Sequence, residues 1–448
     1  MNFENVKKDL LLALSERGIS EYEIYVSDVS DLSVDTLDGA VSAFSSSERG
    51  GVCLKVIKNN RAGYASSELF TAQQMRDLVL CAEENALVCE NECEVLLFGG
   101  SDKYNTSEAT PISLSADELK STALTLSKRL FDGCDAVGRG SATSALCHSA
   151  RVSLVNSCGI DLSYSVSVGA AFAEAVVERD GERQSDYSIK AISAECDEKI
   201  NLIAEEATEK ALSKIGASLI PSGKYDVVID ASAMRALLGT FSSSFSGRAA
   251  LRGMSRLRDK EGERIASEVV TVTDDPMREG SRIHIPFDAE GVATERRVVV
   301  ERGVLLTLLH NRETAKLLGK TTTANASKAS YSSPVGVSPY SLAIEPGTTS
   351  RESLFEAVSD GIYITEVKGL HAGANTVTGD FSLESEGFMI RGGKRAEAVK
   401  SFTVSGNFFE LLLSVEAVAS DLDIGVPMGA TGFGSPSILV RGMSVAGE

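Results

Sequence analysis

The stretch "ALLGTFSSSFSG", residues 236–247, follows the run Tyr225-Asp-Val-Val-Ile-Asp230, which is typical of a buried strand. No proline lies between this run and Pro276, so the sequence predicts a helix directly after the strand. The start of a helix behind a buried strand is a common place for ligand-binding groups. This helix, however, offers only Gly239, Thr240 and serines. The stretch therefore has the setting of a functional site without its usual chemistry.

A domain boundary is expected just before this stretch, in "GASLIPSGKY", where Pro221 and Gly223 interrupt regular structure. We expect an N-terminal domain at residues 1–218 with antiparallel strands and flanking helices. A β-rich C-terminal domain is expected at residues 219–448. The predicted fold class is α+β.

Clear helix and turn signals mark the N-terminal half. Thr71 is expected to cap a helix, and Ser115 with Glu118 forms a capping box before another. Asp38-Gly39 is typical of a hairpin turn. Further helices are predicted near residues 3–17 and 197–215, with strands near 21–28, 31–37, 41–46, 51–58, 62–67, 137–149, 151–157 and 160–178.

The C-terminal half has a different pattern. "RRVVVERGVLLTLLHN" predicts a hairpin that turns at Glu301-Arg302-Gly303, followed by a short helix from Asn311 to Leu318. A helix is predicted near 351–358 and strands near 362–368 and 385–391. The segment 320–340 is polar, small and irregular, and its length indicates a functional or mobile loop.

Composition excludes several classes of function. The formal net charge of −19 would repel a phosphate backbone, so direct nucleic-acid binding is not expected. No uninterrupted apolar run approaches 18 residues, which argues against a membrane span and for a cytoplasmic protein. The eight cysteines all lie in the first 200 residues without a C-x-x-C pair, and we expect reduced thiols.

Few residues in the chain are arranged for catalysis. Zinc sites often use histidine, and the chain has four histidines: His148, His284, His310 and His371. No two of them have the spacing of metal ligands on one helix. A histidine-rich site formed by the tertiary fold stays open. The carboxylates Asp274-Asp275 and Asp288/Glu290 fit turn and cap roles better than acid–base work. The segment "GLHAGANTVTGDFSLESEGF", residues 369–388, is either a binding surface or an ordinary loop.

Several motifs together resemble one family. "GLHAGANTVTGDFS" resembles the C-terminal signature of the TldD/PmbA (TldE) proteins, long labelled modulators of DNA gyrase. Residues 32–66 are similar to the family's N-terminal hairpin region, and "PFDAEGVATERRVVVERGVLLTLLHNRETAKLLG" to its central segment. "GFGSPSILVRGMSV" resembles its closing strand. The resemblance covers nearly the whole chain.

The resemblance implies a bacterial or archaeal peptidase system. TldD subunits are zinc metallopeptidases that carry H-E-x-x-x-H on a helix after a strand and a cysteine ligand near the C-terminus. By order of motifs, Gly239 and Thr240 stand where the first His and the Glu belong, and Ser244 where the second His belongs. The C-terminal cysteine is missing too. Glycine has no ligand atom, and a threonine hydroxyl is no carboxylate base.

The resemblance therefore implies a PmbA/TldE-type subunit with no metal, no cofactor and no catalytic residue of its own. Its expected partners are a TldD-like zinc metallopeptidase in a heterodimer and an unfolded or extended peptide. Peptide is expected to pair with strand edges. The candidates for lining a shared peptide chamber are the segment 320–340 and the loop 369–382, with His371, Asn375, Thr378 and Asp380.

Two alternatives stay open at this stage. One is a self-sufficient metallopeptidase homodimer with an atypical metal site from His310 and His371. The other is a regulatory protein that binds DNA gyrase. A homodimer of the chain when alone is compatible with either.

Overall fold

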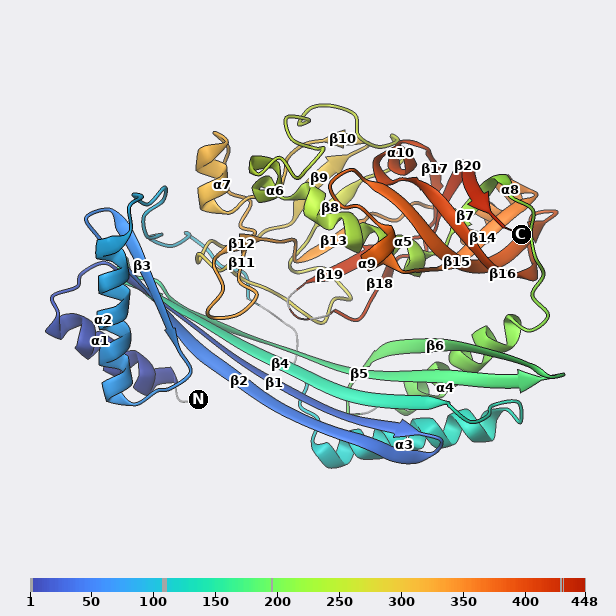
Figure 1. Cartoon of the computed structure of the whole chain (residues 1–448), viewed down its shortest axis with the longest axis horizontal. Helices are drawn as coiled ribbons and strands as arrows, with labels where there is room; N and C mark the ends of the chain where they lie inside the picture. Colours follow the sequence, from blue (N-terminus) through green and yellow to red (C-terminus); the bar gives the residue numbers. More distant parts are fainter. Residues whose placement is uncertain (1–2, 107–110, 195, 428, 430, 448) are drawn as a thin grey trace.

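The computed structural model describes residues 3–106, 111–194, 196–427, 429 and 431–447. The fold is α+β, as predicted. One long curved sheet forms the N-terminal part, and a compact β-rich part lies above its concave face (Figure 1). The prediction of two domains divided at 218/219 stays a prediction.

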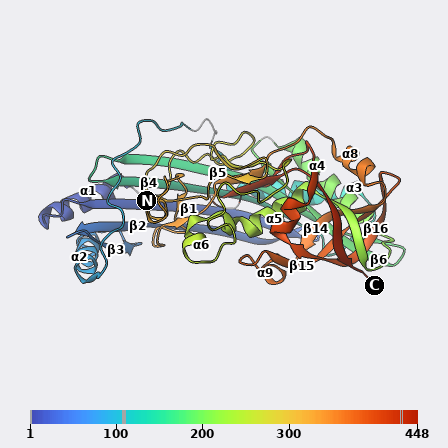
Figure 2. The same cartoon turned by 90° about the horizontal axis from the view of Figure 1, so that it is seen from above.

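The curved sheet has six antiparallel strands in the order β3-β2-β1-β4-β5-β6. The four long strands β1, β2, β4 and β5 run along much of the length of the molecule (Figure 2). Their bounds are β1 Tyr22–Leu37, β2 Ala40–Lys58, β3 Arg61–Ser67, β4 Ala142–Asn156, β5 Asp161–Arg179 and β6 Glu182–Ile192.

The sequence prediction divided these strands too finely. The expected pairs 21–28 with 31–37, and 41–46 with 51–58, are single strands β1 and β2. Polar residues in the middle of β1 do not end it, because both of its neighbours, β2 and β4, continue past them. The polar middle of β2 stays in strand through its pairing with β1 alone. Strand β6 was missed, since its polar sequence lacks the apolar signal of a core strand.

Four helices cover the convex face of this sheet: α1 Phe3–Glu16, α2 Ala72–Val88, α3 Ala116–Gly133 and α4 Asp197–Ser213. The predicted caps are confirmed, because Thr71 and Ser115 each form a full capping box. Leu126 of α3 and Ile203 of α4 pack with Val34 and Ala145 of the sheet. The other face is left for the C-terminal part.

The C-terminal part contains two further six-stranded sheets. The first, ordered β16-β15-β14-β7-β20-β17, closes on itself through a β16–β20 pairing. Its strands are β7 Gly223–Ile229, β14 Gly361–Lys368, β15 Asp380–Arg391, β16 Lys394–Asn407, β17 Val415–Val418 and β20 Ile438–Ala446. The second, ordered β10-β9-β8-β13-β19-β18, contains β8 Val272–Asp274, β9 Arg297–Glu301, β10 Val304–Leu305, β13 Ser341–Ile344, β18 Asp423–Ile424 and β19 Gly432–Ser435.

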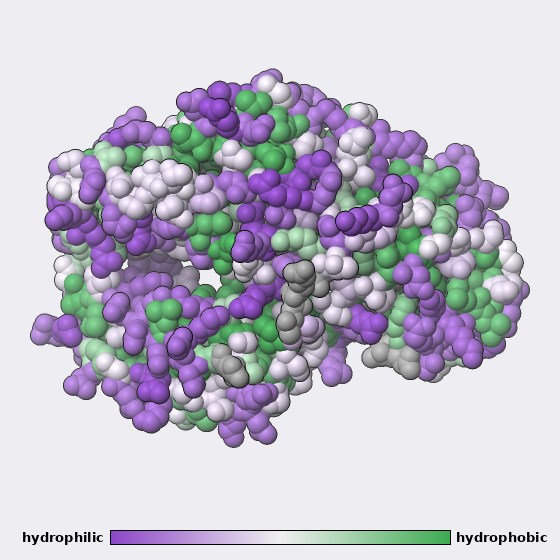
Figure 3. All heavy atoms as spheres, turned by 180° about the vertical axis from the view of Figure 1, so that it is seen from behind, coloured by the Kyte–Doolittle hydropathy of each residue, from purple (hydrophilic) through white to green (hydrophobic). Residues whose placement is uncertain are grey.

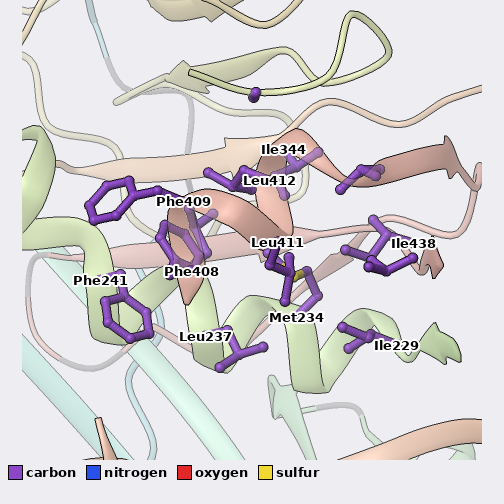
Figure 4. Close-up of a cluster of buried hydrophobic side chains, with 14 of the residues drawn as sticks. Ile229, Met234, Leu237, Phe241, Ile344, Phe408, Phe409, Leu411, Leu412 and Ile438 are labelled. Carbon is purple, nitrogen blue, oxygen red and sulfur yellow. The ribbon is translucent and has the colours of Figure 1, made fainter. Parts of the chain in front are cut away.

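The helix α5, Ala231–Phe241, contacts both of these sheets. Met234, Leu237 and Phe241 are buried in the largest core, beside Phe408 and Leu412 (Figure 4). The remaining helices are short: α6 Gly247–Leu251, α7 Arg312–Leu317, α8 Arg351–Val358, α9 Leu370–Gly373 and α10 Phe408–Leu413. A small hairpin joins β11 Ala326–Ser327 to β12 Gly336–Val337.

Apolar residues join the two parts of the molecule. Ile283, Ile285 and Tyr340 pack against Val166 and Val168 of strand β5. Within the described residues, none of the helices combines the length and the apolar character needed to cross a membrane.

Candidate functional site at the end of the central helix

The helix α5 begins earlier than the opening stretch implied. Asp230 caps it, because its carboxylate accepts a hydrogen bond from the Ser232 N–H at 2.9 Å. The helix ends at Phe241 and a 3₁₀ turn follows over Ser242–Phe245. Gly239 and Thr240 therefore lie in the last turn of α5, not at its start.

The three positions matched to the metallopeptidase motif have no metal-ligating side chains. Gly239 faces an aromatic ring, and a Cβ atom there would lie 3.2 Å from Phe433. The Thr240 hydroxyl donates to a backbone carbonyl one turn earlier, at 2.9 Å. Ser244 is fully buried in the 3₁₀ turn. Hydroxyls engaged with backbone carbonyls are a poor zinc ligand set.

In the part of the chain that the structure describes, no substitute metal site replaces them. Among the described residues, no group of three or more His, Cys, Asp or Glu side chains is placed to hold a metal ion. His310 is fully buried, its Nδ1 lies 3.2 Å from the Thr314 hydroxyl, and its Nε2 has no hydrogen-bond partner. His371 is instead exposed on the short helix α9. The residues present do not fit a catalytic zinc ion.

The candidate chamber loop is shorter than expected, since α9 and β15 leave only residues 374–379 between them. The Asn375 side-chain oxygen accepts from the backbone N–H groups of Val377 and Thr378, at 3.0 and 3.1 Å. The Asp380 carboxylate accepts from the Asn407 amide at 2.8 Å. Both side chains thus order their own region, yet Asn375, Thr378 and Asp380 are all exposed.

Tertiary contacts bring this loop to the end of the central helix. The Ser244 hydroxyl donates to the Thr376 carbonyl at 3.3 Å. Arg256 donates to the Thr378 carbonyl at 3.0 Å, and its guanidinium lies 5.5 Å from the Phe409 ring centroid. The vacant motif positions and the candidate loop therefore form one site, although about 130 residues separate them. Nothing in the sequence pattern indicated Arg256.

Two cavities lie on the concave face of the curved sheet. The larger, of about 540 Å³, lies between strands β1, β2, β4 and β5 and a roof that includes Asp288 and residues 326–332. The smaller, of about 220 Å³, crosses the sheet from Ser45 to Ile189 and is mostly apolar. Both are lined by His148 and Gly429. An opening between the two parts of the molecule is visible from behind (Figure 3).

The segment 320–340 contributes much of the roof of the larger cavity. The Lys328 ammonium lies 4.9 Å from the Tyr25 ring centroid on the sheet below. The Tyr331 ring covers Gly51, where a Cβ atom would lie 2.5 Å away, and its hydroxyl donates to Glu68. None of His371, Asn375, Thr378 and Asp380 lines either of these two cavities. Their role in a chamber stays a prediction.

A charged cluster lies where the two cavities meet. The His148 Nδ1 is 2.6 Å from one carboxylate oxygen of Asp31, and Arg49 donates to the other at 2.6 Å. Burial raises the pKa of Asp31, but these hydrogen bonds outweigh it and hold the pKa below its usual value. An ionised Asp31 directs the Nδ1 proton of His148 toward itself. Sequence reasoning missed the cluster, because only the β1–β4 register makes Asp31 and His148 neighbours.

Asp288 has the structural role expected for it. It accepts hydrogen bonds from the backbone N–H groups of Glu290, Val292 and Ala326 at 2.9 to 3.1 Å. Burial, with the nearby Glu290 carboxylate, raises the pKa of Asp288 to about 8. Asp274 is also buried, and its carboxyl accepts a hydrogen bond from the backbone N–H of Tyr340. Both carboxyls hold the roof over the larger cavity.

Comparison with known proteins assigns nearly the whole chain. Residues 222–447 match the PmbA/TldA metallopeptidase C-terminal domain, residues 109–215 its central domain and residues 22–86 its domain 1. A metalloprotease of Methanothermobacter thermautotrophicus is 36% identical over 263 residues, which cover 56% of each chain.

Two solved structures share the fold. A Thermotoga maritima protein named as a modulator of a DNA gyrase is 28% identical, with a TM-score of 0.89 over 99% of this chain and 100% of that one. TldE from Thermococcus kodakarensis is 21% identical, with a TM-score of 0.87 over 99% of this chain and 100% of that one, and this likeness concerns the fold alone.

Proposed function

The chain belongs to the PmbA/TldD metallopeptidase family, and on this premise we propose that it is the PmbA/TldE-type subunit of a two-chain peptidase. It pairs with a TldD-like chain, which supplies the zinc ion and the catalytic base. The pair degrades or processes unfolded peptides in the cytoplasm. This chain contributes walls and contacts for the peptide and performs no bond cleavage.

One observation carries the proposal. The last turn of α5 and the 3₁₀ turn after it offer Gly239, Thr240 and Ser244 where a metallopeptidase needs two ligands and a base. The Ser244 hydroxyl is engaged by the loop at Thr376, so the position is part of a packed structural contact. A chain of this kind acts through a partner.

The concave face of the curved sheet supports a peptide-holding role. Its larger cavity has a volume in the range of pockets for small ligands, and tyrosine, lysine and histidine side chains line it. The smaller, mostly apolar cavity continues beyond His148. An extended peptide of a few residues fits such a divided groove, with apolar side chains in the smaller cavity.

Co-expression with the TldD-like chain of the same organism tests the proposal. We expect each chain alone to leave an unfolded casein-like substrate uncleaved, and the purified pair to cleave it at least tenfold faster than either chain. Elemental analysis should find about one zinc per pair and none in this chain alone after mild dialysis. Chelator-sensitive cleavage by this chain alone would instead support an atypical metal site with His310 or His371. Binding to gyrase without a TldD-like chain would support the regulatory alternative.

His371 is the best probe of the loop at the end of the central helix. It is exposed, so His371→Ala should leave the thermal unfolding midpoint unchanged. If it contacts the peptide, turnover by the pair should fall about tenfold, which corresponds to one lost hydrogen bond of about 1.4 kcal/mol. The matched variant is Asn375→Ala, which removes the turn to Val377 and Thr378 and should lower stability and turnover together. Full turnover by a stable His371→Ala pair would exclude this residue from the chamber.

A further inference from the structure

The outer edge of strand β2 is open over much of its length. Strand β1 pairs with β2 from Ala40 to Val56, but β3 pairs with the other edge only from Val52 to Lys58. No other strand in the described part of the chain pairs with residues 40–51. This leaves a free edge of about 40 Å, at 3.4 Å per residue, along the outside of the sheet (Figure 1).

The hairpin end of this edge has little of the usual protection against pairing with another chain: its two charged residues, Glu48 and Arg49, lie near the far end, and the register shift opposite Asp35 is the irregularity in its pairing with β1. Residues 39–47, "GAVSAFSSS", carry no charge and no proline. The opposite edge strand, β6, carries Glu182, Arg183, Asp186 and Lys190 and packs beside α4. An open edge with an uncharged stretch of this kind is a template for an added strand. The contrast between the two edges indicates that β2 is covered in the working protein.

A folded partner suits this edge better than a bare peptide. All residues from 37 to 46 are exposed, so both faces of the hairpin end are open. Leu37, Val41 and Phe44 are 47, 42 and 57% exposed. A single peptide strand would pair with the edge but leave these faces in water. A globular chain covers edge and faces together, as at the uncharged centre of a protein interface.

We propose that residues 40–51 of β2 dock the matching strand of a second chain of this fold, the TldD-like partner, and join two curved sheets into one. This partner rests on the function proposed above. The chain has a formal net charge of −19, whereas residues 39–47 at this edge form an uncharged stretch that a second chain can approach without meeting a charged side chain. The small side chains of Ala40, Ala43 and Ser45 permit that approach. Ser45 also lines the smaller cavity, so the partner would extend the wall of the groove.

The ladder register shows which backbone groups face the partner. Asn59 and Asn60, at φ 53° and 59°, form a two-residue turn, so Lys58 and Arg61 are its hydrogen-bonded pair. The direction of the backbone N–H groups alternates along a strand. From Lys58 back to the register shift opposite Asp35, the even-numbered residues of β2 therefore point their N–H groups away from β1. Ser46 is therefore an outward donor. A proline at 46 removes it without breaking a β1–β2 hydrogen bond.

The test measures pairing of the full chain with the TldD-like chain. Ser46→Pro and Phe44→Asp should each raise the dissociation constant of the pair at least tenfold. Ser46→Thr, which keeps the backbone N–H, should pair like the wild type. Circular dichroism melts check that each variant is folded. If Ser46→Pro does not fold, Phe44→Asp decides, because its exposed side chain contributes little to the fold.

Each outcome has a definite meaning. Folded Ser46→Pro and Phe44→Asp variants that pair as tightly as the wild type overturn this inference and leave the proposed function standing. Variants that pair normally but no longer bind an unfolded peptide assign the edge to peptide, and also overturn it. A wild-type chain that never pairs with the TldD-like chain overturns the proposed function and this partner with it.

Discussion

Replacing Phe241 by alanine is expected to lower the free energy of unfolding by about 3–5 kcal/mol. Phe241 is fully buried at the end of α5, and its ring stacks on that of Phe408 with centroids 4.6 Å apart and planes at 15°. Phe381 lies 6.4 Å away on strand β15. Three elements therefore meet at this ring, and its removal leaves a cavity that they cannot all close.

Urea unfolding followed by circular dichroism measures this loss, since the chain has no tryptophan for fluorescence. Leu413→Ala is the control, because Leu413 is 48% exposed in the neighbouring helix α10 and should cost less than about 1 kcal/mol. A Phe241→Ala variant as stable as the control would contradict the packing described here. The variant should also lose the Ser244 contact with the loop, because that contact depends on the position of the helix end.

Replacing Lys214 by methionine is expected to lower the free energy of unfolding by about 2–4 kcal/mol, somewhat below the range for a fully buried ion pair. The Lys214 side chain is 14% exposed and lies 2.9 Å from Asp186 and 2.5 Å from Glu386. Asp186 belongs to the curved sheet and Glu386 to strand β15, so one ammonium joins the two parts of the molecule. Methionine keeps the side-chain volume but leaves the Asp186 carboxylate unpaired.

The pH dependence of stability distinguishes this ion cluster from simple packing. Burial lowers the pKa of Lys214, but Asp186 and Glu386 outweigh it and raise the pKa above its usual value, so the stabilisation is full below about 10.5 and lost at higher pH. Burial raises the pKa of Glu386, but Lys214 and Lys368 outweigh burial and lower the pKa. The stabilisation that Glu386 contributes is therefore lost as pH falls below about 4.5. Lys214→Met should therefore be most destabilising near neutral pH.

A double-variant cycle completes the test of Lys214. The double variant Lys214→Met with Asp186→Asn should lose less stability than the two single variants lose together, because the second change removes the carboxylate charge that Lys214→Met leaves without its cation. Lys368→Ala is the matched control: its side chain is 37% exposed and pairs with Glu386 alongside Lys214. Equal losses at Lys214 and Lys368 would show that burial of the ammonium is unimportant.

Local signals predicted much of the fold. The capping boxes at Thr71 and Ser115, the turn at Arg302-Gly303 and the short helix after Asn311 were confirmed, because each depends on a few neighbouring residues. Strand lengths were less accurate. Whether polar residues interrupt β1 or β2 depends on the strands beside them, which lie far away in the sequence.

The amino acids at positions 239, 240 and 244 are enough to show that neither a zinc ligand nor a carboxylate base stands there, since this conclusion needs no coordinates. The α+β class was also predicted from the sequence, because its strand patterns follow one another in runs that helix patterns flank, instead of alternating one by one with helices. Three features became visible in the folded chain alone: Ser244 contacts the loop at Thr376, Asp31 pairs with His148, and residues 40–51 form an open edge. These features are contacts, or missing contacts, between distant segments, and the ladder register and domain packing that produce them are set by the whole fold.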